Sequence, residues 1–412
     1  MSEPQAYHLF DVTGIELEYM VVDRDSLQVQ PIVDQLFETV TGRVTSDVDR
    51  GDIEWSNELV AHVVELKTAE PVSDLQACAV RFRAEIRAIN GILSSLNAML
   101  LPTAAHPLMD PFTQTTLWAH DYSEIYALYN RIFDCRGHGW SNLQSMHLNL
   151  PFVGDDEFGQ LHSAIRVLLP LVPALAASSP LLDGQATGWL DSRMESYLHH
   201  QERLPALMGP FIPERVFDQT GYTREVFEPI LRALAPFDVD GVMNQHFANS
   251  RGAIARFDRG AVEIRVIDVQ ECPSMDLAIA ELVVATTRAL VEGHWADPLE
   301  SRSLVEGELL DVFRQVIQMG RDTEIRHAGL LSALGLDRTP RTTGDVWRVL
   351  IERLHSELSP SAARGVALLL EQGSLAERIL WRTGSAPSRD KIVDVYRELA
   401  ACLHDDRPFA RG

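Results

Sequence analysis

The stretch Gly14-Ile15-Glu16-Leu17-Glu18-Tyr19-Met20-Val21-Val22-Asp23 decides how the rest of the chain is interpreted. Its apolar side chains alternate with glycine, glutamate and methionine, which is the two-residue period of a β-strand with one buried face. Glu16 and Glu18 would then share the other face, about 7 Å apart at a rise of ~3.3 Å per residue. Carboxylates this close repel each other unless water surrounds them or a cation lies between them. Taken alone, the strand also fits an ordinary solvated face, because antiparallel sheets often expose one side.

The composition indicates a globular protein with a large core. Of the 412 residues, 46% are hydrophobic and 23% are charged, which is ordinary for folded proteins. The net charge is −23, from 36 basic and 59 acidic residues, and the isoelectric point is near 5.0. Because the sequence has no long basic run, nucleic acid and anionic membrane surfaces are disfavoured as partners.

Cysteine usage and apolar segments favour a cytoplasmic location. The four cysteines are far apart and form no C-x-x-C pair: Cys78, Cys135, Cys272 and Cys402. This spacing argues against a disulfide framework and a structural zinc site, and it fits a reducing compartment. The N-terminal residues show no export signal. The most apolar run, residues 167–177, is short and contains two prolines, so we do not expect it to cross a bilayer.

A second strand is expected at residues 58–68, and it raises a question of register. Glu58 and Glu65 are seven positions apart, so a regular strand would place them on opposite faces. Both can point to one site only if Glu58 lies in the preceding loop or a bulge intervenes. The sequence leaves these two arrangements open.

Two further strands, at residues 144–150 and 260–268, also alternate apolar and polar side chains. Their polar faces carry His147 and Asn149 on the first strand, and Glu263 and Arg265 on the second. We expect helices at residues 31–40, 73–99 (with Ser73 as N-cap) and 276–292. Residues 41–57 are expected to form a loop with short extended pieces, and the chain from residue 297 onward to be helical without strands.

One sheet that presents all these strands would bring several carboxylates and an imidazole to the same side. Such a cluster is repulsive when empty, and hard divalent cations such as Mg²⁺ stabilise it through oxygen ligands. These cations also bridge the oxygens of polyphosphates. An arginine beside a glutamate can make a bidentate contact to phosphate or carboxylate. His147 alone would be typical of an ordinary half-buried histidine.

The order of these motifs resembles the glutamine synthetase/glutamate–cysteine ligase superfamily, and most closely glutamate–cysteine ligase family 2, the carboxylate–amine ligases. The matching segments are Gly14-Ile-Glu-Leu-Glu-Tyr19, Glu58-Leu59, Val64-Glu65, Ala105-His106-Pro107, Leu168-Leu-Pro-Leu171, Ala177-Ser-Ser-Pro180, Thr187-Gly188, Ser192-Arg193 and Val262-Glu-Ile-Arg-Val-Ile-Asp268. The resemblance covers about residues 8–295 and is fainter in the helical tail.

The resemblance implies an α+β fold like that of glutamine synthetase and the guanidino kinases. A curved, mostly antiparallel sheet would carry helices on its outer face and hold ATP and metal ions on its concave side. Residues 1–296 would form the catalytic domain, and the helical C-terminal region, residues 297–412, would pack on it.

The same resemblance implies roles for particular residues. Glu18, Glu58 and Glu65 would hold one Mg²⁺ (or Mn²⁺), and Glu16, His147 and Glu263 the other. Arg265, Glu263 and Arg256 would be catalytic, with Arg265 at the transferred phosphoryl group or the substrate carboxylate. Asn149, Arg251 and Arg193 would contact the nucleotide or a substrate; for the last two, a surface role is an equal alternative.

The chain departs from the family pattern around the third strand. Relatives commonly have a second histidine where this chain has Asn149, and a glycine where it has Ser145 or Pro151. Asparagine can donate and accept hydrogen bonds but cannot titrate. The family's usual pair of substrates is therefore not carried over to this chain.

The expected reaction is ATP-dependent amide formation through an acyl phosphate, with glutamate and cysteine, or another amino compound, as small-molecule substrates. Candidates for the base that deprotonates the amine are Asp49, Asp52 and Glu54. Two alternatives remain: a guanidino-compound kinase of the same fold, and a non-catalytic binding relative. The oligomeric state is left open.

Overall fold

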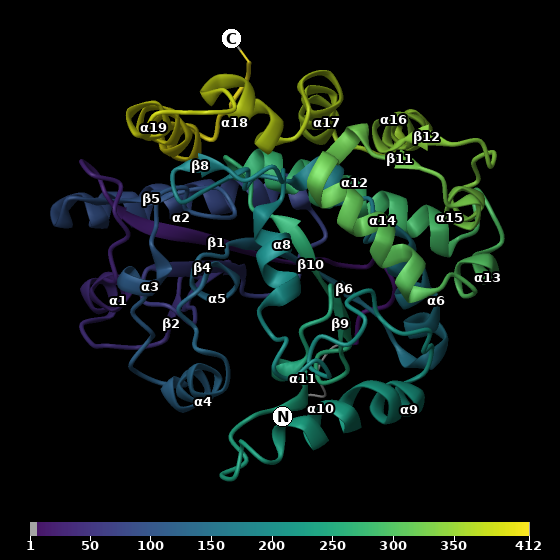
Figure 1. Ribbon diagram of the computed structural model, residues 1–412, viewed down its shortest axis with the longest axis horizontal. Helices are drawn as coiled ribbons and strands as arrows, with labels where there is room; N and C mark the ends of the chain where they lie inside the picture. Colours follow the sequence, from purple (N-terminus) through teal and green to yellow (C-terminus); the bar gives the residue numbers. More distant parts are fainter. Residues whose placement is uncertain (1–5, 412) are drawn as a thin grey trace.

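The computed structural model describes residues 6–411, and a sheet of eight antiparallel strands crosses its centre (Figure 1). The strands are β1 (Gly14–Asp23), β2 (Asp47–Asp49), β3 (Ile53–Asn57), β4 (Val63–Thr68), β5 (Ala98–Leu101), β6 (Ser145–Pro151), β9 (Ala253–Arg256) and β10 (Ala261–Asp268). Their order is β2-β3-β4-β1-β6-β10-β9, and β5 pairs with the C-terminal half of β1. The expected α+β class with a mostly antiparallel sheet is confirmed.

Apolar side chains from one face of this sheet form the main core. Ile15, Leu17, Tyr19 and Val21 of β1 are fully buried, as the alternating pattern predicts. They join a cluster with α2 (Leu75–Leu93) and α12 (Pro273–Val291). Helix α12 packs against α2, α6 (Gly154–Leu168) and α17 (Pro360–Gln372), so it is surrounded by protein, and it is apolar on most of its circumference.

The opposite side of β1 has two different halves. Met20 and Val22 follow Glu16 and Glu18 on that side, because side chains alternate along a strand. Both apolar residues are fully buried. They belong to a second core with α18 (Leu375–Thr383) and α19 (Arg389–Asp405), the yellow helices of Figure 1. The C-terminal helices therefore cover one half of this face and leave the acidic half for other contacts.

The remaining helices of seven or more residues surround these layers. They are α1 (Val33–Thr41), α4 (Ser123–Phe133), α8 (Ser192–His199), α10 (Glu228–Leu234), α14 (Glu306–Met319) and α16 (Thr343–Leu354). Among the helices of residues 6–411, none combines the length and the apolar character needed to cross a bilayer.

Several expected boundaries were wrong. The strand expected at residues 58–68 begins only at Val63, whereas the short extended pieces expected within residues 41–57 are β2 and β3. The long helix ends at Leu93 and its N-cap is Asp74, whose carboxylate accepts from the Ala77 amide, rather than Ser73. The C-terminal region contains one two-residue strand pair, β11 (Glu324–Ile325) and β12 (Arg341–Thr342).

Candidate active site

Strand register brings the expected site residues into adjacent positions on the acidic face. Glu16 of β1 lies opposite Lys67 of β4 on one side and His147 of β6 on the other. Glu18 lies opposite Glu65 of β4. Residues directly opposite each other in an antiparallel pair have side chains on the same face, so these four strand residues around Glu16 form one continuous surface.

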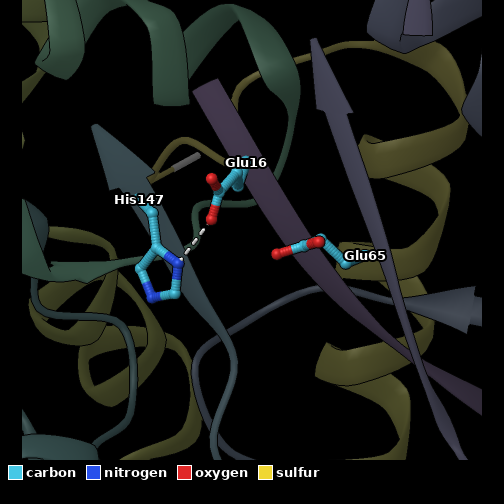
Figure 2. Close-up of side chains that lie close together, drawn as sticks. All are labelled: Glu16, Glu65 and His147. Atoms are coloured by element: carbon cyan, nitrogen blue, oxygen red, sulfur yellow. Dashed lines mark hydrogen bonds and ion pairs between the residues drawn. The ribbon is translucent and has the colours of Figure 1, made fainter. Parts of the chain in front are cut away.

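Glu58 reaches this surface from the connection between β3 and β4, outside either strand. The loop alternative for Glu58 is therefore the correct one. Carboxylate oxygens of Glu18, Glu58 and Glu65 lie within 4.8 Å of one another. Figure 2 shows a second group, Glu16, Glu65 and His147, whose ligand atoms meet the same limit. Glu65 belongs to both groups.

Glu16 is held in place from β6. His147 Nδ1 and Glu16 Oε2 are 2.8 Å apart (the dashed line in Figure 2), and Asn149 Nδ2 donates to Glu16 Oε1 at 3.1 Å. Gly14 lies opposite Asn149, and a Cβ at position 14 would lie 3.1 Å from the Asn149 Cβ. A glycine therefore allows β6 to approach β1 closely enough for the Asn149 contact.

The charges of the cluster shift its pKa values in opposite directions. Burial alone would raise the pKa of Glu16, but His147, Arg265 and Arg259 overcome it and lower the pKa to about 2. Burial alone would lower the pKa of His147, but Glu16 and Glu18 raise it to about 9. At neutral pH the two therefore form an ion pair. A cation that binds His147 would have to displace this proton, because only neutral imidazole is a ligand.

Two further carboxylates of these groups, Glu65 and Glu58, are harder to ionise than usual. Burial, with Glu16 nearby, raises the pKa of Glu65 to about 7, although Lys67 and Ser56 partly oppose the shift. Burial, with Glu18 and Glu65 nearby, raises the pKa of Glu58 well above its ordinary value. The protein alone thus lacks enough positive charge to offset these carboxylates, and a bound divalent cation would supply it.

Arginines gather at the β9–β10 end of the same face. Arg265 Nε donates to Glu263 Oε1 at 2.6 Å, and Arg256 Nη1 donates to Glu263 Oε2 at 3.4 Å. Arg256 also pairs with Asp258 at 2.9 Å. Glu263 approaches His147 only to 3.9 Å, so in this structure it holds the two guanidiniums rather than joining the carboxylate groups.

Arg193 and Arg251 were expected to contact the nucleotide or a substrate, but their guanidinium groups donate to other parts of the protein. Arg193 is buried, with Nε on Asp268 at 2.5 Å and further donors on the Arg265 carbonyl oxygen. Arg251 is buried and paired with Glu214 through two nitrogens. Both arginines therefore support the fold, and Arg193 supports the strand that carries Arg265.

Sequence reasoning missed a polar contact network at the β3 edge of the site. Ser56 Oγ donates to Glu65 Oε2 at 2.6 Å, and Lys67 Nζ lies 2.9 Å from Glu54 Oε1 and 3.7 Å from Glu65 Oε2. The signal was available, because Lys67 follows Glu65 by two positions in a strand and must share its face. Of the three candidate bases, Glu54 lies on this face, and Asp49 lies directly opposite it in β2 and is exposed. Asp52 pairs with Arg81 of α2.

The donor set fits Mg²⁺ or Mn²⁺. Carboxylate oxygens dominate both groups, one imidazole is included, and Glu65 links the groups. Hard divalent cations prefer such oxygen ligands.

Comparison with known proteins identifies the family. Residues 12–398 match the family described as glutamate–cysteine ligase family 2. The chain belongs to this family. A protein of Archaeoglobus fulgidus described as uncharacterized is 30% identical over 399 residues, which are 96% of this chain and 99% of that protein. A protein of Corynebacterium glutamicum provisionally named glutamate–cysteine ligase 2 is 24% identical over 282 residues, 68% of this chain and 66% of that protein.

Solved structures show the same fold. The glutamate–cysteine ligase of Francisella tularensis in complex with AMP matches with a TM-score of 0.64 and 14% identity, over 97% of this chain and 90% of that chain. The bifunctional glutathione synthetase of Pasteurella multocida matches with a TM-score of 0.63 and 15% identity, over 96% of this chain and about half (52%) of that chain. At these identities the likeness concerns the fold.

Proposed function

We propose that this family member is an ATP-dependent carboxylate–amine ligase that forms an amide through an acyl phosphate, with substrates like those of glutamate–cysteine ligases. One observation carries the proposal: two clusters of candidate metal ligands share Glu65 and lie on the same sheet face as Arg256 and Arg265. Membership in a ligase family supports it.

One ligand cluster would hold a divalent cation through Glu18, Glu58 and Glu65. The other would hold a cation through Glu16 and His147, with Glu65 or Glu263. Bound Mg²⁺ would supply positive charge for the phosphates of ATP. Asn149 Nδ2 donates to one oxygen of Glu16, so this carboxylate is already oriented before a cation binds.

The arginine end would receive the phosphoryl group that is transferred. Glu263 holds the guanidiniums of Arg256 and Arg265 beside the carboxylates, and planar guanidinium donors match phosphate and carboxylate oxygens. A substrate carboxylate oxygen would attack the γ-phosphorus and release ADP. The amine nitrogen would then attack the acyl carbon, releasing phosphate and losing a proton. The chain's part is to align two anions and offset their charge.

Product analysis tests the proposal. The protein is incubated with Mg²⁺, [γ-³²P]ATP and a pool of amino acids and amines, and the products are identified by mass spectrometry. An amide together with ADP and phosphate supports the ligase. A phosphorylated guanidine would instead indicate the kinase, and no turnover would indicate a non-catalytic relative.

A matched pair of variants ties turnover to the acidic face. Glu16→Gln is expected to abolish amide formation while the protein stays folded, because it removes a charge but keeps the shape of the side chain. Glu38→Gln makes the same change on the exposed side of α1 and is expected to leave turnover unchanged. If Glu16→Gln unfolds the protein instead, Glu16 is structural.

A further inference from the structure

Lysine is almost absent from this chain. Of the 36 basic residues, 34 are arginine and only 2 are lysine, Lys67 and Lys391. Lys391 is exposed near the start of α19. Lys67 lies on β4 within the acidic face, directly opposite Glu16 on one neighbouring strand and Glu54 on the other. A composition that uses arginine nearly everywhere thus retains an ammonium group beside the candidate cation sites.

The Lys67 ammonium lies among carboxylates from three strands. Its Nζ is 2.9 Å from Glu54 Oε1, 3.7 Å from Asp47 Oδ1 and 3.7 Å from Glu65 Oε2. The side chain is 29% exposed, whereas that of Glu65 is only 10% exposed. Lys67 therefore links the β2–β3 hairpin to the one carboxylate that both ligand groups share.

The two carboxylate oxygens of Glu65 have different contacts with Ser56 and Lys67. Oε2 accepts the Ser56 hydroxyl at 2.6 Å and faces the Lys67 ammonium. Two contacts on one oxygen restrict rotation of the carboxylate, so the other oxygen stays available to the neighbouring glutamates. Groups that hold a ligand in this way commonly change metal affinity about 10–100-fold when they are removed.

We propose that Lys67 is a positioning residue whose ammonium, together with the Ser56 hydroxyl, orients Glu65 for both cation sites, and that arginine cannot replace it. This inference rests on the cation sites of the proposed function. An ammonium is compact and can approach carboxylates from several directions, whereas a guanidinium is planar and larger and prefers bidentate partners. Three carboxylates from three strands around one point favour the ammonium.

A role through charge alone makes a different prediction. Lys67 carries a positive charge near the bound cations, and this charge repels them. Removing it would tighten cation binding if charge were its only contribution, and exchanging it for arginine would change little. Positioning predicts weaker binding in both variants, because Glu65 loses a contact in each.

The test is a titration of the full-length protein with Mn²⁺, in which electron paramagnetic resonance measures the free ion and the spectrum of the bound ion. Lys67→Arg is expected to raise the Mn²⁺ dissociation constant about tenfold or more and to alter the spectrum of the bound ion. Lys67→Met is also expected to raise it. Lys391→Arg, the same substitution at the other lysine, is expected to match the wild type.

Ser56→Ala provides an independent check on the same oxygen. It leaves every charge in place, and it is expected to raise the dissociation constant as well. In the double variant Lys67→Arg/Ser56→Ala, the dissociation constant should rise by less than the product of the two single-variant factors, since both residues act through Glu65. Thermal unfolding without Mn²⁺ verifies that each variant is folded.

The outcomes separate this inference from the proposed function. If the wild type binds no Mn²⁺, the proposed cation sites are wrong and the role of Lys67 falls with them. If the wild type binds Mn²⁺ but Lys67→Arg binds it equally well, or Lys67→Met binds it more tightly, the positioning role is overturned while the proposed function stands.

Discussion

Burial of Glu65 in the folded protein opposes ionisation of its carboxyl group. Its side chain is 10% exposed, and burial with Glu16 nearby raises its pKa from an ordinary 4.5 to about 7. The folded protein therefore favours the protonated form more than the unfolded chain does. This raised pKa stabilises the fold fully below pH 4.5, and the contribution is lost as the pH rises to about 7.

The first prediction follows from that sign. The raised pKa of His147, from 6.5 to about 9, acts in the same direction, since its contribution is lost as the pH rises through about 9. The cation-free protein should thus lose thermal stability at this site between about pH 5 and pH 9. Mg²⁺ should raise the melting temperature more at pH 8 than at pH 6, as scanning calorimetry can measure.

Glu65→Gln is the control for this pH dependence. A neutral amide removes the titrating group, so the cation-free variant should lose less stability with rising pH than the wild type. It should also lose most of the stabilisation by Mg²⁺. Equal Mg²⁺ stabilisation of variant and wild type would contradict the assignment of Glu65 as a shared ligand.

At the same scale, single residues show where sequence reasoning succeeded and failed. The alternation in β1 and β6 was enough to place Glu16, Glu18 and His147 on one face. The partners of Arg193 and Arg251, Asp268 and Glu214, are distant in sequence, and no local pattern predicts them. Motif matching alone therefore suggests a ligand role for two arginines whose guanidinium groups form ion pairs within the protein.

Among the elements, β2 and β3 were the hardest to predict. They lie in a segment rich in Asp, Gly and Ser, which is typical of loops. β3 pairs with β4, and β2 pairs with β3, so strand pairing overrides the local composition. This extra hairpin also places Glu58 in a connection, which explains how residues seven apart reach one site.

A buried ion pair joins helix α18 to the connection between β10 and α12, and this gives a prediction at the scale of elements. Arg378 and Glu271 are both fully buried and 2.5 Å apart, and Glu271 also accepts the Phe409 amide at 3.0 Å. Arg378→Met should lower the free energy of unfolding by about 3–5 kcal/mol, because it leaves a buried carboxylate without its partner. Urea unfolding measures this loss.

The matched control replaces both partners. Arg378→Met/Glu271→Met removes the unpaired charge, so it should recover much of the lost stability. A loss below about 1 kcal/mol in the single variant would mean that water or another group compensates Glu271.

The whole molecule is built around β1, which contributes to two cores. Tyr19 and Val21 belong to the main core, and Met20 and Val22 belong to the core formed with α18 and α19. The expected division at residue 296 separates helices from the strand they cover. We propose that residues 297–411 form part of one folding unit with the sheet.

Truncation tests this proposal. A chain that ends at residue 296 would expose Met20, Val22 and Leu101, all fully buried in the full chain. We expect it to aggregate or to show no cooperative unfolding transition by circular dichroism. A soluble fragment with a sharp transition would show that the catalytic domain is independent.

The class of fold and the acidic face could be predicted from four strands and their order. The C-terminal arrangement could not, because amphipathic helices reveal that they pack but not what they pack against. The apolar residues Met20 and Val22 carried the missing signal. They occupy the polar positions of the β1 alternation, where burial requires a second layer.

The central claim is that one face of the sheet holds two divalent cations on either side of Glu65. Crystals of the full-length protein grown with Mn²⁺ and a non-hydrolysable ATP analogue test it most directly, through anomalous scattering from manganese. We predict two peaks, one beside Glu18, Glu58 and Glu65 and the other beside Glu16 and His147, with phosphates towards Arg256 and Arg265. Manganese peaks at none of these side chains, with the nucleotide bound elsewhere, would contradict the account.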